Sequence, residues 1–149
     1  MNAVAITVTA TYPVARKDLW EELRLIERHV HWMADAQSIE FVNEQKEGVG
    51  TTFRCKTRVG PFVTIDVLTI TSWVPAESMG VQHRGLVRGA GVFTLTSVTE
   101  NSSQLVWSES LTFPWWCAGS IGGRLARPVL RALWRGNLRR LGARLASAA

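Results

Sequence analysis

The last part of the chain, residues 117–149, carries an apolar stripe and a basic stripe, both at helical spacing. The apolar stripe consists of Leu130, Trp134, Leu138, Leu141 and Leu145. The basic stripe consists of Arg124, Arg127, Arg131 and Arg135. Because residues three and four apart share one face of an α-helix, the two stripes predict an amphipathic helix of up to about 28 residues. Its apolar side requires a broad apolar surface to pack against.

The residues before this helix are predicted to form an antiparallel sheet, which would supply that surface. Val4–Tyr12 alternates apolar and polar residues like a strand, and Val14–Val30 has helical periodicity with a break near Arg24. Six further strands are predicted between Glu40 and Phe113. The turn signals that separate them are Glu47–Gly50, Gly60–Pro61, Pro75 with its neighbours, a hairpin loop at Gly85–Gly91, and Glu100–Ser103. One strand, two short helices, six strands and one long helix indicate an α+β fold.

Composition is that of an ordinary globular protein. The chain has 149 residues, of which 46% are hydrophobic and 19% charged, and this fits one domain over residues 1–149. No apolar run is long enough for a transmembrane helix, and the strand-like N-terminus argues against a cleaved signal peptide. Cys55 and Cys117 form neither a disulfide framework nor a metal-binding spacing. We therefore expect a cytoplasmic protein without a metal or cofactor.

The net charge of +5 is unevenly distributed. Residues 117–149 hold seven arginines and no acid, whereas residues 1–116 hold ten basic and twelve acidic groups. Such an arginine face either solvates the outer side of a helix or binds an anionic membrane or an acidic partner. The sequence has no nucleic-acid-binding motif, and aromatic residues are not interleaved with the arginines. Nucleic acid is therefore not expected as a partner, and weak contact with an anionic membrane surface stays open.

Alternation along the strands predicts which side chains face the long helix. Those expected on this inner face are Phe53, Cys55, Phe93, Leu95 and Trp107, with Glu109 in the last strand and His83 in the fifth. Arg54, Lys56 and Arg58 are expected outside, because three unpaired buried cations would be prohibitive. In the fourth strand both phases are apolar, so the side of Asp66 is left open.

Glu109 and His83 are the polar residues expected on this apolar face. A buried carboxylate needs donors, a cation or water, or its pKa rises by as much as about 3–5 units, and such groups often line cavities. The alternatives are a Glu109 bonded near a strand end and an edge-exposed His83. Because the sixth strand separates theirs, the two side chains should start about 10 Å apart. We therefore expect a ligand to span them rather than a direct hydrogen bond.

Several short sequence motifs, together with the order of helices and strands, resemble those of a known superfamily. They are Pro13-Val14, Leu19-Trp20, Ile26–His29 ahead of Trp32-Met33, Gly48–Gly50, Thr71–Pro75, Trp107–Glu109 and Phe113–Trp115. Over residues 4–146 the chain resembles the START/SRPBCC superfamily, specifically its polyketide cyclase/dehydrase and lipid-transport-like branch. This resemblance implies a helix-grip fold: a seven-stranded antiparallel sheet wraps a long C-terminal helix and leaves a cavity between them. It does not imply one activity, since members include binders, transporters and cyclases.

The first half of the long helix departs from an ideal helical sequence. Three glycines and Pro128 predict a break or kink there, which would shape the mouth of the cavity. Trp115 would then lie at the entrance, where it either clamps a flat ligand or staples the helix start to the sheet. Leu130 and Trp134 would line the cavity from the helix side.

Three functions follow as hypotheses. The first is a protein, monomeric or homodimeric, that binds a small apolar molecule, whose polar end Glu109 and His83 would hydrogen-bond. The second is a polyketide cyclase, dehydratase or aromatase that uses the same residues as acid and base. The third is an interaction protein that docks on an anionic surface through its arginines. A nucleophilic role is not expected for Cys55, which has no cation beside it on its own face, so the remaining acid–base candidates are Glu109 with His83 or Asp66. His29 and His31 fall on different sides of a helix, so shared metal binding is not expected there.

Overall fold

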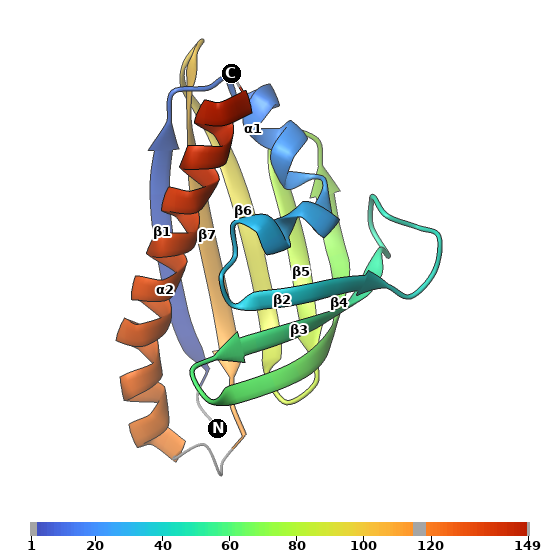
Figure 1. Cartoon of the computed structure of the whole chain (residues 1–149), viewed down its shortest axis with the longest axis vertical. Coiled ribbons are helices and arrows are strands. Elements are labelled where there is room, and N and C mark those ends of the chain that lie inside the picture. Colours follow the sequence, from blue (N-terminus) through green and yellow to red (C-terminus); the bar gives the residue numbers. More distant parts are fainter. Residues whose placement is uncertain (1–2, 115–118, 149) are drawn as a thin grey trace.

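The computed structural model describes residues 3–114 and 119–148, without the side chains of 119–124. In chain order (Figure 1) the elements are β1 (Val4–Tyr12), α1 (Arg16–Leu23), the 3₁₀ helix η1 (Ile26–His31), β2 (Ala36–Phe41), β3 (Thr52–Val59), β4 (Phe62–Val74), β5 (Ser78–Arg84), β6 (Arg88–Thr99), β7 (Ser102–Thr112) and α2 (Gly119–Ala148). The strands form one antiparallel sheet of seven, in the order β1-β7-β6-β5-β4-β3-β2. The predicted class, strand number and pair of short helices are confirmed.

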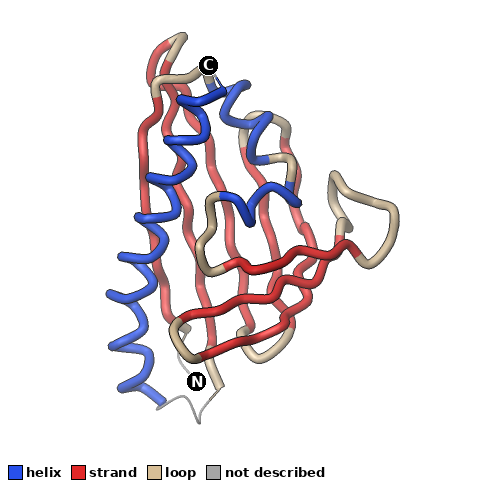
Figure 2. The backbone as a smooth tube through the Cα atoms, in the orientation of Figure 1, coloured by secondary structure: helices blue, strands red, loops and turns tan. Residues whose placement is uncertain are grey.

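The sheet curves strongly around its inner face. In Figures 1 and 2, β2 and β3 cross in front of the strands at the centre of the sheet, and α2 runs along β1 at the opposite edge. The short helices α1 and η1 cover the inner face near the C-terminal end of α2. Within the described part of the chain, no helix has both the length and the hydropathy needed to span a membrane.

Strand faces follow the predicted alternation where the sequence has a clear phase. Phe53 and Cys55 are buried, whereas Arg54, Lys56 and Arg58 lie on the other face of β3 and are more open to solvent. In β4, whose phase was ambiguous, Asp66 is buried on the inner face and the apolar Ile65 is 63% exposed on the outer one. The inner phase of β4 is thus the one that holds Asp66, Leu68 and Ile70.

Helix α2 is packed on the sheet through its C-terminal half, whereas two apolar side chains nearer its N-terminus are exposed. Four members of its apolar stripe are buried: Trp134, Leu138, Leu141 and Leu145. Tyr12 Oη donates a 2.8 Å hydrogen bond to the Leu138 carbonyl and so joins the helix to β1. Leu125 and Val129, in the other half, are 65% and 55% exposed.

Of the break or kink predicted near Pro128, the break does not occur: α2 is one continuous helix of 30 residues. The kink stays a prediction. Proline removes one backbone hydrogen bond and normally disrupts a helix interior. Here Pro128 is exposed, so water can satisfy the carbonyl that loses its partner. Arg127 and Arg135 of the basic stripe also turn outward.

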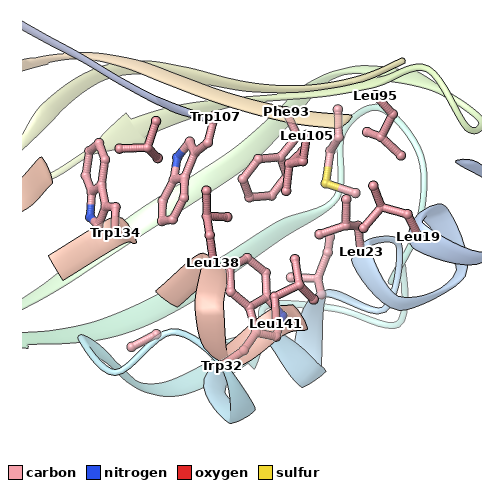
Figure 3. Packing of buried hydrophobic residues seen from close by; sticks show 14 of the residues in the cluster. Leu19, Leu23, Trp32, Phe93, Leu95, Leu105, Trp107, Trp134, Leu138 and Leu141 are labelled. Carbon is pink, nitrogen blue, oxygen red and sulfur yellow. The ribbon is translucent and has the colours of Figure 1, made fainter. Parts of the chain in front are cut away.

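The core is rich in tryptophan and leucine (Figure 3). Trp107 of β7 and Trp134 of α2 stack with ring centroids 4.6 Å apart and planes 14° apart, joining the sheet to the long helix. At the other end of the core, Leu95 lies near Leu19 and Leu23 of α1. Full burial of one such side chain contributes about 1.5–3 kcal/mol to folding, so these contacts hold both helices on the sheet.

Candidate functional site

A cavity of about 710 Å³ lies between the inner face of the sheet, η1 and α2. Its volume is within the range of small-molecule sites, which is about 300–1,000 Å³. Most of the lining side chains are apolar or aromatic. Of the residues predicted from the sequence, those that line it are Phe53, Cys55, His83, Phe93, Trp107, Glu109, Leu130 and Trp134.

Two of the predicted residues have a different outcome. Leu95 was expected on the cavity, but it is 3% exposed and is not among the lining residues. It points inward as predicted, two residues further along β6 than Phe93, and there α1 covers the inner face and fills the space above it. Trp115 lies outside the described residues.

His83 and Glu109 lie much closer together than the separation of about 10 Å expected from their strands, although they do not form a well-aligned hydrogen bond. His83 Nε2 lies 3.3 Å from Glu109 Oε2, and both side chains are largely buried. The strand between them, β6, has Gly91 opposite Glu109. A Cβ atom at residue 91 would lie 2.7 Å from Glu109 Cγ, so the missing side chain is what allows Glu109 to lean across β6. The short distance was not expected because Gly91 was assigned to a hairpin loop, whereas β6 already begins at Arg88.

The two oxygens of Glu109 face different partners. Trp107 Nε1 donates a 3.0 Å hydrogen bond to Oε1, while Oε2 faces His83. The same Trp107 ring stacks on Trp134, so its position is set from both sides. This arrangement orients the carboxylate with a neutral donor on one oxygen and an ionisable one on the other.

Two opposing effects act on the pKa of His83. Burial lowers the pKa of His83, but the neighbouring carboxylates Glu109 and Asp66 outweigh this effect, so the pKa is raised above its ordinary value. The 3.3 Å contact is poorly aligned, and Nε2 has no well-formed hydrogen bond among the described residues. Its N–H is therefore available to a ligand.

Asp66, whose side was left open, lies on the cavity wall with both oxygens engaged. Its Oδ1 accepts a 3.0 Å hydrogen bond from the Leu86 backbone N–H, and its Oδ2 accepts one of 2.9 Å from Thr64 Oγ1. A Cβ atom on Gly85 would lie 2.0 Å from Oδ1, so the loop after β5 reaches the carboxylate only because residue 85 is glycine. Asp66 thus fixes this loop at the cavity.

Sequence reasoning missed a further carboxyl group on the cavity, Asp35, in the loop between η1 and β2. Burial raises the pKa of Asp35, and a hydrogen bond of 2.7 Å from Asn137 Nδ2 to its Oδ1 opposes that rise. Asn137 is fully buried on α2 and accepts a 3.0 Å hydrogen bond from the Ala34 N–H through Oδ1. One signal was present: Asn137 stands three residues after Trp134 and four before Leu141, inside the apolar stripe.

Two further groups on the cavity are held neutral. His29 Nε2–H donates to the Leu23 carbonyl at 2.8 Å, and burial lowers the pKa of His29 to about 4. Burial likewise raises the pKa of the Cys55 thiol, which makes it a poor nucleophile. Within residues 3–114 and 119–148, no group of three or more His, Cys, Asp or Glu side chains is placed to hold a metal ion.

Solved structures of other proteins share this fold, although their sequences differ widely from this one. No family model and no curated protein matches the sequence. Among solved structures, a protein from Thermus thermophilus is 14% identical, with a TM-score of 0.82 over 97% of this chain and 99% of that one. The ZhuI aromatase/cyclase from Streptomyces sp. R1128 is 19% identical, with a TM-score of 0.73 over 98% and 93%. A START superfamily protein from Mycobacterium smegmatis is 9% identical, with a TM-score of 0.78 over 97% and 99%.

These similarities define a class of protein by its architecture, a curved antiparallel sheet closed by a long C-terminal helix. The chain has the helix-grip fold of the START/SRPBCC superfamily, and the resemblance drawn from the sequence is confirmed at that level. At these identities the similarity concerns the fold, so the ligand and any activity must be argued from the cavity itself.

Proposed function

We propose that this protein binds a small, mostly apolar molecule in the cavity between the sheet and α2, and that Glu109 and His83 hydrogen-bond its polar end. The observation that carries the proposal is the cavity of about 710 Å³, in which aromatic and aliphatic side chains surround a few convergent polar groups. Glu109 Oε2 is an acceptor and His83 Nε2–H a donor at one place on an otherwise apolar wall.

The first experiment is native mass spectrometry of the purified protein, followed by titration with N-phenyl-1-naphthylamine, an uncharged apolar fluorophore. We expect either a co-purifying small molecule or saturable, one-to-one binding with enhanced probe fluorescence. A protein that carries no small molecule and does not bind the probe would contradict the proposal.

A matched pair of variants separates the cavity from the surface. Val81 lines the cavity, and its neighbour Gln82 is exposed on the opposite face of β5. Val81→Phe places a ring inside the cavity and should weaken probe binding, whereas Gln82→Phe adds the same ring outside and should leave it unchanged. Equal effects of the two variants would place the probe elsewhere.

A second candidate function is acid–base catalysis of the cyclase, dehydratase or aromatase type. It is favoured by the 3.3 Å contact between Glu109 and His83, since paired ionisable groups in a cavity are the usual acid–base machinery. Solved structures with this fold include aromatase/cyclases. Glu109 would take a proton from a methylene between two carbonyls, the carbanion would attack another carbonyl, and His83 would protonate the resulting alkoxide.

The enzymatic candidate is tested with a linear poly-β-ketone thioester. Glu109→Gln keeps the shape of the side chain but removes its basicity. Cyclisation that the wild-type protein accelerates and this variant does not, with probe binding retained, would support catalysis. Equal rates with and without protein would leave ligand binding as the function.

The mouth of the cavity favours a further role, contact with an anionic lipid surface. Apolar side chains from three separate segments both line the cavity and are strongly exposed: Phe62 (64%), Leu86 (49%), and Leu125 and Val129 of α2. Arg127 lies between the last two on the same helix and is exposed. An apolar rim with adjacent cations suits a membrane interface.

This role is tested by co-sedimentation with phosphatidylglycerol vesicles, using phosphatidylcholine vesicles for comparison. Binding to the anionic vesicles should be lost in Arg127→Glu and retained in Arg139→Glu, which changes an exposed arginine near the other end of α2. Absence of wild-type binding would rule the role out.

A further inference from the structure

We propose, on the basis of the ligand-binding function above, that the cavity selects neutral or cationic apolar molecules bearing hydroxyl or amine donors and rejects carboxylic acids, fatty acids included. The proposal is based on the excess of carboxyl groups over basic groups among the residues that line the cavity.

Three carboxyl groups lie on the cavity wall: Asp35, Asp66 and Glu109. Of the side chains that the structure describes, no lysine or arginine lines the cavity, and its basic groups are His29 and His83. His29 is held neutral by its burial and by its bond to Leu23. Among the described lining side chains, one ionisable cation therefore stands against three acids, while Arg140 acts on Asp35 from outside the lining.

The outer surface has the opposite balance. The chain as a whole has a net charge of +5, and Arg54, Lys56 and Arg58 of β3 project from the convex face, directly behind the cavity wall. An anionic ligand would be attracted to the exterior but would meet carboxylates inside. Selection against anions is thus a property of the cavity, where the low dielectric strengthens charge–charge interactions.

The polar contacts within the wall leave mainly acceptors for a ligand. Trp107 Nε1–H and Asn137 Nδ2–H, neutral donors beside these acids, are already bonded to Glu109 and Asp35. Carboxylate oxygens have several acceptor positions each, so Glu109 and Asp35 retain capacity for a hydroxyl or ammonium group. A ligand carboxylate beside them must either take up a proton or lose affinity, and a shift of one pKa unit corresponds to a tenfold change.

The test uses three ligands that differ only in their head group: 1-decanol, decylammonium and decanoate, each displacing N-phenyl-1-naphthylamine at pH 7.5. We expect decanol and decylammonium to displace the probe and decanoate to need a concentration about tenfold higher or more. Decanoate that competes as well as decanol would overturn the proposal while leaving ligand binding intact. If neither the probe nor any decyl compound binds, the proposed function fails and this inference fails with it.

Charge-neutralising variants then locate the selectivity. Asp35→Asn and Glu109→Gln should each narrow the difference between decanoate and decanol. Asp18→Asn makes the same change in net charge at an exposed position on α1 and should leave that difference unchanged. An equal effect of all three would assign the selectivity to overall charge and overturn the assignment to the cavity wall.

Discussion

Glu109 and His83 touch across a strand that separates their own: Glu109 Oε2 lies 3.3 Å from His83 Nε2, although β6 runs between β7 and β5. Side chains two strands apart ordinarily start about 10 Å from one another, because each strand spacing is about 4.8 Å. Here the intervening position is Gly91, and the Glu109 side chain fills the volume that a side chain at residue 91 would need. The polar centre of the cavity thus depends on a glycine that takes no part in its chemistry.

Gly91→Ala should break this contact. The added methyl group would lie within 3 Å of three atoms of the Glu109 side chain, so Glu109 has to turn away. We expect the free energy of unfolding in urea to fall by about 1–3 kcal/mol, as for other overpacked sites, and the pKa of His83 in NMR titration to fall. Thr94→Ala, at an exposed position of the same strand, should change neither quantity. An unaltered His83 pKa in Gly91→Ala would show that the glycine does not control the contact.

Glu109→Gln should lower the pKa of His83, because burial then acts with only Asp66 opposing it. In the wild-type protein the raised pKa means that the native state binds the proton more tightly than the unfolded state. His83 therefore stabilises the fold below its unfolded pKa of about 6.5, and this contribution is lost as pH rises through the folded pKa. NMR titration of His83 checks the direction, with Glu100→Gln, in the exposed β6–β7 turn, as the control. A pKa that does not move would assign the shift to Asp66.

His29 should make the protein less stable in mild acid. Its folded pKa of about 4 lies below the unfolded value of about 6.5, so the unfolded state takes up the proton first. Stability is then fully present above pH 6.5 and falls as the pH drops towards 4, by about 3 kcal/mol from this residue. His29→Gln, which can still donate to the Leu23 carbonyl, should show a flatter dependence of unfolding free energy on pH. Parallel pH profiles of the two proteins would contradict the assignment.

Asn137→Leu should destabilise the protein despite placing an apolar residue in an apolar stripe. It removes the acceptor of the Ala34 N–H and the donor to Asp35, and buried groups left without partners cost about 1–3 kcal/mol each. We expect a loss of about 3 kcal/mol in urea unfolding. Asn101→Ala, at an exposed turn between β6 and β7, should be within about 0.5 kcal/mol of wild type. A stable Asn137→Leu protein would mean that the polar link between α2 and the Ala34–Asp35 loop is dispensable.

Local patterns were sufficient for the elements of this fold. Strand alternation identified the inner faces of β3, β5, β6 and β7, and helical periodicity identified the buried stripe of α2, because burial on one side of an element repeats with that element's own period. The same patterns were insufficient where two phases were both apolar. In β4 the buried phase includes the polar Asp66 as well as Ile70, and the partners of Asp66, the Leu86 N–H and Thr64, compensate for its burial.

Which residues form the site, and which of them touch, depends on contacts between distant parts of the chain. The sequence alone determined that one long helix covers one antiparallel sheet, and it predicted Glu109 and His83 on the covered face with a strand-end or edge position as the alternative. Only the tertiary structure decided that these two residues touch, that Asp35 joins them on the cavity wall through Asn137, and that Leu95 is excluded by α1. Each of these facts depends on strand register and on how helices close over the sheet, and packing between distant segments, rather than local periodicity, sets both.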